Sequence, residues 1–132
     1  MKDPDHRYRG IPLNLNDRRT TERFDLPDAH IELILQGIAH RNIKLIDITF
    51  NSIRVITSLM VKEEQDLLVK IKIPYKQPLS LKGFVLRLDE VYNKHDKFMV
   101  TIKFHPFSTY ERYNALEDRK ALKDILDRGV KI

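Results

Sequence analysis

The stretch Leu67-Leu68-Val69-Lys70-Ile71-Lys72-Ile73, followed directly by Pro74, decides the fold class of this chain. Every second side chain from 67 to 73 is apolar, and two of the three side chains between them are lysines. This period of two is typical of a strand with one buried face, and proline ends such a strand because it has no N–H group for the ladder. Comparable apolar patterns predict further strands at residues 29–35, 43–49, 53–59, 79–88 and 98–104.

The order of these segments indicates an antiparallel β-protein. Six short strands follow one another without helices between them, which is typical of a barrel or a sandwich and not of a parallel sheet. Gly83, inside the fifth segment, predicts a bulge or bend there.

The last part of the chain changes to the period of a helix. Ser108 precedes Glu111 by three residues, which is the spacing of a capping box at a helix start. Gly129 can end the helix. One face of the helix carries Leu122, Ile125 and Leu126. We therefore expect a mainly-β fold: a six-stranded antiparallel β-barrel with a C-terminal α-helix and an irregular N-terminal segment.

Length and composition fit one globular domain. The chain has 132 residues, of which 42% are hydrophobic and 33% are charged, and this balance argues against wholesale disorder. Residues 1–27 are polar and contain three prolines. We predict a flexible N-terminal segment at residues 1–16 and a barrel domain with its C-terminal helix at residues 17–132.

Several classes of protein are excluded or made less favourable by what the sequence lacks. No apolar run approaches the roughly 18–20 residues of a membrane span, and the N-terminus does not have the pattern of a secretory signal peptide. The absence of cysteine excludes a disulfide scaffold and a thiol nucleophile, and it agrees with a cytoplasmic protein. The five histidines lack the spacing of a metal pair, and no nucleophile elbow or phosphate-binding glycine loop occurs. We expect no catalytic residues, no metal and no enzymatic activity.

Three arginines lie close together in the irregular segment from Asp17 to Phe24: Arg18, Arg19 and Arg23. Arginine is always charged, presents five donors in a planar fork, and can bind a phosphate, stack on a base or contact the edge of guanine. The net charge of +5 weakly favours anionic partners as well. The alternative is a solvated loop in which these arginines pair with neighbouring acidic residues.

A second stretch, Asp47 to Val55, lies between the second and third predicted strands and contains Asp47, Thr49, Ser52 and Arg54. Together with Arg19-Thr20-Thr21-Glu22-Arg23, it resembles the PilZ domain family. That family pairs an Arg-x-x-x-Arg motif in an N-terminal loop with an Asp/Asn-x-Ser-x-x-Gly motif at the next strands. The resemblance covers roughly residues 17–127.

The resemblance implies a receptor for cyclic di-GMP, a bacterial second messenger with two guanines and two phosphates. By this resemblance, Arg19 and Arg23 contact phosphates and guanine edges, Asp47 accepts from guanine N–H groups, and Thr49 offers the hydroxyl of the family's serine. Arg18 favours an intercalated pair of ligand molecules. Ser52 and Arg54 complete the candidate ligand-binding residues.

Two positions depart from the family pattern. Thr49 keeps the hydroxyl of serine and adds a methyl group, which a strand accepts easily. Ser52 stands where the family has glycine. If a positive φ is required there, serine costs about 1 kcal/mol, or up to about tenfold in binding if only the bound form needs it.

Three functions follow as hypotheses. The first is a cyclic di-GMP-binding sensor or adaptor whose N-terminal arginine loop becomes ordered on ligand binding and which signals through an unidentified protein partner. The second is a PilZ-like protein-interaction module that no longer binds the nucleotide. The third is a β-barrel that binds single-stranded nucleic acid, which is less favoured because most aromatic residues fall on strand faces assigned to the core.

Overall fold

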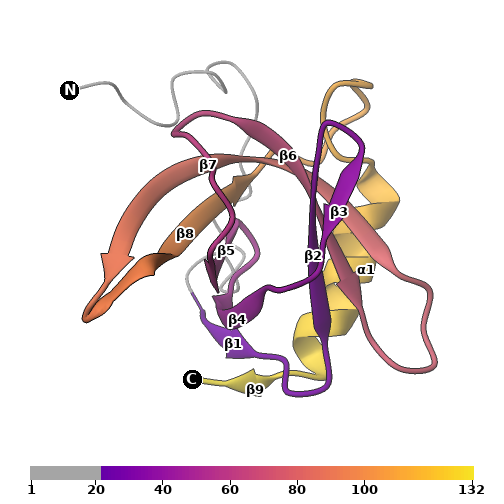
Figure 1. Cartoon of the computed structure of the whole chain (residues 1–132). Helices are drawn as coiled ribbons and strands as arrows, with labels where there is room; N and C mark the ends of the chain where they lie inside the picture. Colours follow the sequence, from indigo (N-terminus) through magenta and orange to yellow (C-terminus); the bar gives the residue numbers. More distant parts are fainter. Residues whose placement is uncertain (1–21) are drawn as a thin grey trace.

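The computed structural model describes residues 22–132, with His95 described by its backbone alone. Among these residues the chain forms nine strands and one helix (Figure 1). In chain order the elements are β1 (Phe24–Asp25), β2 (His30–Leu35), β3 (Ile38–His40), β4 (Lys44–Ile48), β5 (Ser52–Thr57), β6 (Asp66–Lys72), β7 (Leu79–Val91), β8 (Lys94–Phe104), α1 (Leu116–Asp127) and β9 (Val130–Lys131).

The strands form one antiparallel sheet in the order β3-β2-β6-β7-β8-β5-β4-β1-β9. The six strands expected from the sequence are confirmed as β2 and β4 to β8. The three short strands β1, β3 and β9 were not expected. Two of them, β3 and β9, form the two edges of the sheet, and β1 joins β4 to β9.

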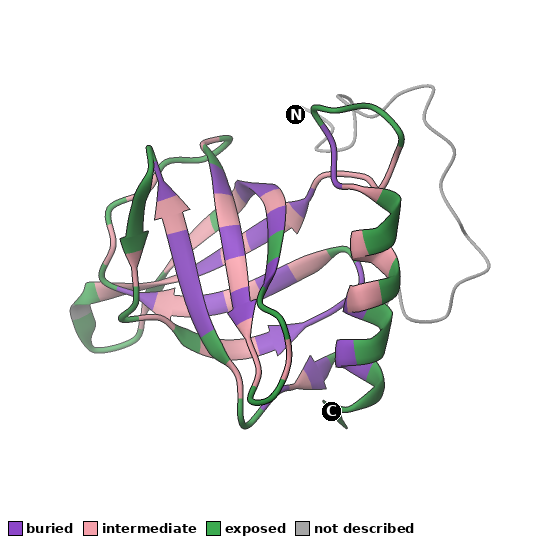
Figure 2. Cartoon of the chain, turned by 90° about the vertical axis from the view of Figure 1, so that its right-hand side faces the viewer, coloured by how far each residue is buried: buried purple, intermediate pink, exposed green. Residues whose placement is uncertain are grey.

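The sheet is strongly curved but its described pairings do not close (Figure 1). A closed six-stranded barrel is therefore not confirmed; the mainly-β class and the C-terminal helix are. Because the sheet is curved, the buried faces of the strands in both of its halves point toward one shared core. Helix α1 packs beside this core with its buried side facing the sheet (Figure 2).

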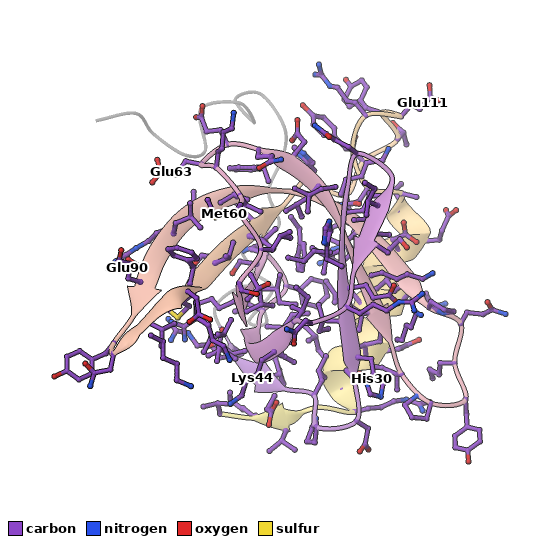
Figure 3. All side chains as sticks on the ribbon, in the orientation of Figure 1. His30, Lys44, Met60, Glu63, Glu90 and Glu111 are labelled. Carbon is purple, nitrogen blue, oxygen red and sulfur yellow. The ribbon has the colours of Figure 1, made fainter. Side chains whose placement is uncertain are left out.

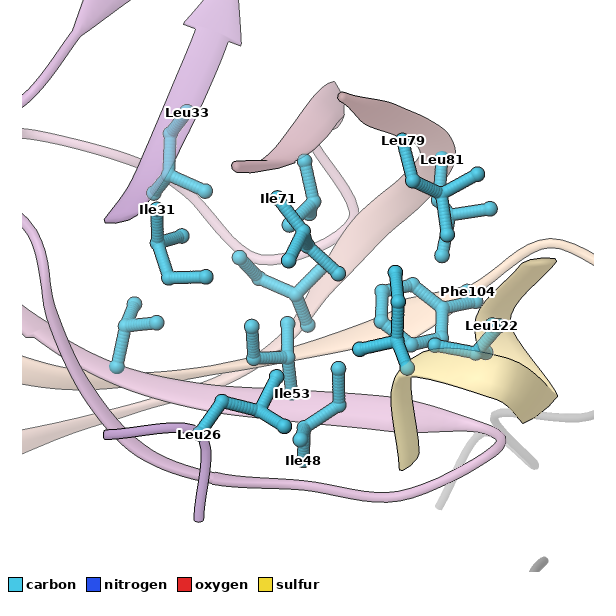
Figure 4. Close-up of a cluster of buried hydrophobic side chains, with 14 of the residues drawn as sticks. Leu26, Ile31, Leu33, Ile48, Ile53, Ile71, Leu79, Leu81, Phe104 and Leu122 are labelled. Atoms are coloured by element: carbon cyan, nitrogen blue, oxygen red, sulfur yellow. The ribbon is translucent and has the colours of Figure 1, made fainter. Parts of the chain in front are cut away.

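The core follows the period of two that the sequence shows. In β6 the side chains at Leu67, Val69 and Ile71 are buried, and those between them are half-buried. Leu122, Ile125 and Leu126 of α1 are buried as expected and belong to the same cluster of apolar side chains (Figure 4).

The helix begins seven residues later than the capping-box pattern predicted, at Leu116, and its N-cap Ala115 makes no side-chain cap hydrogen bond. Ser108 instead accepts a hydrogen bond from the N–H of Tyr110 in a loop. The physical reason is Asn114, which is 2% exposed. Its side chain accepts from the N–H of Lys82 (2.6 Å) and donates to the carbonyls of Lys82 (3.0 Å) and His105 (2.8 Å). These tertiary hydrogen bonds outweigh the local preference for a helix.

Gly83 lies in a regular part of β7, and the bulge expected there falls instead between Val85 and Arg87. The need for glycine is one of space, because a Cβ at Gly83 would lie 2.7 Å from the carbonyl oxygen of Lys103 on β8. Gly129 follows the helix as predicted, and a Cβ there would lie 2.8 Å from a side-chain carbon of Leu26.

Candidate functional site

The second motif forms the hairpin between β4 and β5. The N–H of Thr49 donates to the carbonyl of Ser52 at 2.8 Å. The Thr49 hydroxyl accepts from the N–H groups of Asn51 and Ser52, both at 3.0 Å. Local bonds of this kind are the ordinary reason for a threonine at a turn. The hydroxyl that the PilZ resemblance assigns to a ligand therefore also holds the turn.

Asp47 is the centre of the charged cluster at this hairpin. It lies on β4 directly opposite Arg54 of β5, next to a register shift between Leu45 and Asp47. Asp47 is 4% exposed. Arg54 donates from Nε to one carboxylate oxygen at 2.8 Å and from Nη2 to the other. This fork-to-fork geometry is the strong form of an arginine–carboxylate pair, and the hydrogen bond to Asp47 raises the pKa of Arg54 above its ordinary value.

Arg23 brings the first motif to the same place. Its Nη1 lies 3.9 Å from a carboxylate oxygen of Asp47, and its side chain is 57% exposed. It is held there by β1, which pairs with β4 through Phe24 and Ile48. The carbonyl of Arg23 also accepts from the N–H of Ile132 at 2.9 Å, beyond β9. Arg18 and Arg19 lie outside the described residues, so only the second arginine of the first motif can be placed.

Ser52 does not have the backbone conformation that the sequence analysis considered. Among the described residues, positive φ angles occur at Gln36, Gly37, Glu64, Tyr75 and Asn93, and not at Ser52. Ser52 begins β5 and pairs with Lys103 of β8. Its hydroxyl lies 3.2 Å from that of Thr49. In this conformation serine carries no cost from positive φ.

Neighbouring residues that the motifs did not indicate also surround the hairpin. The register places Thr101 of β8 opposite Arg54, on the face that points away from the core. The guanidinium of Arg119 on α1 lies 5.1 Å from the centre of the Phe50 ring, which ties the helix to the turn. The period of two could have placed Thr101 beside Arg54, whereas no sequence signal linked Arg119 to Phe50.

The arrangement is suited to an anion with hydrogen-bond donors. Arg23 offers exposed donors to a phosphate or to the acceptor edge of guanine. Asp47 has two oxygens with about four acceptor sites, so it can accept from a second donor group while it holds Arg54. A cavity of about 580 Å³ between β7 and residues 108–118, which form the loop before α1 and the start of the helix, includes none of the motif residues.

Residues 22–132 show neither a metal-binding cluster nor a membrane-spanning helix. No group of three or more histidine, aspartate or glutamate side chains is arranged to hold a metal ion in this part of the chain. Helix α1, which the same residues contain, is neither long nor apolar enough to cross a membrane.

Comparisons with known proteins show a shared fold. No family model matches the chain, and no curated protein matches it significantly. The solved structure of the Bacillus subtilis inhibitor of motility, MotI/DgrA, is similar to it with a TM-score of 0.58 and 17% sequence identity. The match covers 85% of this chain and 50% of the other, so the chain spans about half the length of that protein. This likeness supports the PilZ-like fold that the two motifs imply.

Proposed function

We propose that this chain is a cytoplasmic, non-enzymatic PilZ-like sensor or adaptor that binds cyclic di-GMP and passes the signal to a protein partner. The observation that carries the proposal is the meeting of the two motifs: Arg23 of the first lies 3.9 Å from Asp47 of the second, and Arg54 orients Asp47. The fold shared with an inhibitor of motility supports it.

Each residue has a role in the proposed complex. Arg23, together with Arg18 and Arg19 of the same segment, binds phosphate and guanine. Asp47 accepts from guanine N–H groups, and Arg54 keeps its carboxylate oriented. Thr49 and Ser52 hold the hairpin turn against which the ligand lies. Ligand binding joins the arginine segment to the sheet, and the newly ordered surface meets the partner.

The test is a calorimetric titration of the whole chain with cyclic di-GMP and, in parallel, with cyclic di-AMP. Arg23→Ala is expected to weaken binding of cyclic di-GMP by about 1.5–3 kcal/mol, the scale of a charge-assisted hydrogen bond. Asp47→Ala is expected to reduce the preference for guanine, because adenine offers an acceptor where guanine offers a donor. Equal binding by wild type and Arg23→Ala would remove this site.

A second candidate function has its own observation. Arg54 already binds both oxygens of Asp47, and the Thr49 hydroxyl already accepts two hydrogen bonds. A site whose polar groups are already paired within the protein suits a PilZ-like interaction module that no longer binds the nucleotide. Failure to bind cyclic di-GMP at millimolar concentration would favour this second function, and binding of a short single-stranded oligonucleotide instead would favour a nucleic-acid-binding barrel.

A further inference from the structure

β3 lies at one end of the sheet formed by the described strands, and we call its outer side the free edge. β3 pairs with β2 alone among the described strands. The two strands are joined by Gln36 and Gly37, with φ angles of 49° and 81°, which is the two-residue hairpin turn of type I′. In such a hairpin Ile38 and His40 direct their backbone groups to β2. The N–H and C=O of Ala39 therefore point away from β2, toward the free edge.

A groove of about 660 Å³ lies beside this edge. One wall is formed by residues 39–43, and the other by residues 57–60 at the end of β5; we call it the edge groove. Thr57 joins the walls, because its hydroxyl donates to the carbonyl of Asn42 (3.5 Å) and accepts from the N–H of Leu59 (3.1 Å). The groove is thus built by two segments that a buried side chain holds together.

Two large apolar side chains are exposed at the edge groove. Met60, in one wall, is 81% exposed (Figure 3). Ile38, which precedes the other wall in the chain, is 62% exposed. Ile38 pairs with Leu35, whose side chain is buried in the core, so it is on the inner face of the sheet and is exposed because the sheet ends there. A strand added to β3 would cover Ile38 and continue the core.

The charge at the edge groove favours an acidic occupant. No carboxylate is among the described residues that form its walls, whereas Arg41 and His40 are. Glu32, the acid paired with Arg41, lies 3.4 Å from it and also bonds Lys72, so this carboxylate faces two cations. The Arg41 side chain is 78% exposed and can reach a further carboxylate.

We propose that the edge groove binds an acidic, extended segment of a partner protein as an added strand on β3. The backbone of the segment pairs with Ala39, its inward apolar side chains cover Ile38 and Met60, and its carboxylates face Arg41. The groove lies at the open end of the β4–β5 hairpin, opposite the turn that carries the candidate ligand site. The binding itself does not depend on cyclic di-GMP.

The first experiment uses a fluorescein-labelled ten-residue peptide that alternates valine with glutamate, titrated with the whole chain without nucleotide. We expect saturable binding by fluorescence anisotropy, and at least tenfold weaker binding of the matched valine–lysine peptide. Met60→Glu and Ile38→Glu each weaken binding of the acidic peptide at least tenfold. Tyr110→Glu, at a residue that is 60% exposed and does not line the edge groove, is the matched control and leaves binding unchanged. Equal binding of the two peptides overturns the proposal.

The second experiment tests strand addition itself. Ala39→Pro removes the N–H on the free edge without removing a bond to β2, and it is expected to abolish peptide binding. Ala39→Val keeps the N–H and is expected to bind like wild type. Circular dichroism checks that both variants are folded. Peptide binding by folded Ala39→Pro refutes the added strand. Self-association of the wild type in sedimentation that Met60→Glu abolishes would assign the groove to a second copy and would also overturn the proposal.

Discussion

Asp47 is 4% exposed and faces two guanidinium groups, one half-buried and one largely exposed. A carboxylate this far from water needs a partner, because an unpaired buried charge is strongly destabilising. Arg54 is that partner, and its side chain is still 28% exposed. The loss of stability therefore depends on which member of the pair is removed.

Arg54→Ala is expected to destabilise the fold more than Asp47→Ala. Among the described residues, removal of Arg54 leaves the buried carboxylate with the more distant Arg23 as its cation, at a cost of about 3 kcal/mol. Removal of Asp47 leaves an arginine that can turn toward water, at a cost of about 1–2 kcal/mol. Urea denaturation of both single variants and the double variant measures these costs. A larger loss for Asp47→Ala, or strictly additive losses, would contradict this account.

Glu32 predicts a pH dependence of stability with a definite sign. The hydrogen bond from Lys72 is the main cause that holds the pKa of the Glu32 carboxyl below its ordinary value of 4.5, although burial opposes it. A lowered pKa in the folded state gives stability that is present above the ordinary pKa and is lost as the pH falls toward the folded pKa. We therefore expect Glu32→Gln to lose less stability on acidification than wild type, measured by urea unfolding between about pH 6 and pH 3.

Asp118 supplies the matched control because its shift has the opposite sign. Burial, and then the neighbouring charge of Glu117, raise the pKa of the Asp118 carboxyl. Its protonation favours the folded state, so its contribution is lost as the pH rises. Asp118→Asn should therefore make the acid loss of stability steeper, whereas Glu32→Gln makes it shallower. If the free energy of unfolding falls equally steeply with decreasing pH in both variants, neither carboxyl controls the loss of stability in acid.

At the scale of elements, the long strands could be predicted from the sequence, whereas the short strands β1, β3 and β9 could not. The alternation in β6 and β8 corresponds directly to a buried and a half-buried face, because successive side chains of a strand point to opposite sides of the sheet. β3 and β9 have three and two residues, too few for a period of two to be detected. The pairing of Asp47 with Arg54 depends on the register of two strands, which a bulge shifts. The sequence stretch therefore contained both residues but could not show that they form an ion pair.

The loop before α1 shows where local signals fail. Ser108 and Glu111 have the spacing of a capping box, yet this segment forms a loop held by Asn114. The decisive partners, Lys82 and His105, are 32 and 9 residues away in the chain. Reasoning from a window of neighbouring residues could not find them.

Asn114→Ala is expected to cost about 2–4 kcal/mol of unfolding free energy, since it removes three hydrogen bonds and leaves their partners unsatisfied. Urea denaturation measures the cost, and hydrogen exchange at the Lys82 amide should become faster because that N–H donates to the Asn114 side chain. Asn42→Ala, at an exposed asparagine, is the control and should stay within about 0.5 kcal/mol of wild type. A change below about 1 kcal/mol for Asn114→Ala would mean that the loop is held by other contacts.

At the scale of the whole molecule, the sheet brings the two ends of the described chain together. β1 lies between β4 and β9, so the strand that follows Arg23 is paired on one side with the candidate site and on the other with the end of the chain. The opposite edge of the sheet, β3, carries the edge groove. A ligand and a partner would thus bind at separate places that the β4–β5 hairpin connects.

Removal of residues 130–132 tests whether β9 holds the candidate site in place. Without β9, the N–H of Ile132 no longer donates to the carbonyl of Arg23, and β1 keeps its partner β4 alone. Hydrogen exchange at the Phe24 and Asp25 amides should become faster. If cyclic di-GMP binds as proposed, calorimetry should show weaker binding, up to about thirtyfold, because ordering one backbone residue costs about 1–2 kcal/mol. The double substitution Val130→Ala and Ile132→Ala removes two exposed side chains but keeps the backbone bonds, so it should bind like wild type.

Faster exchange with unchanged affinity would show that β9 supports the fold but not the site. Unchanged exchange would show that β4 alone positions Arg23.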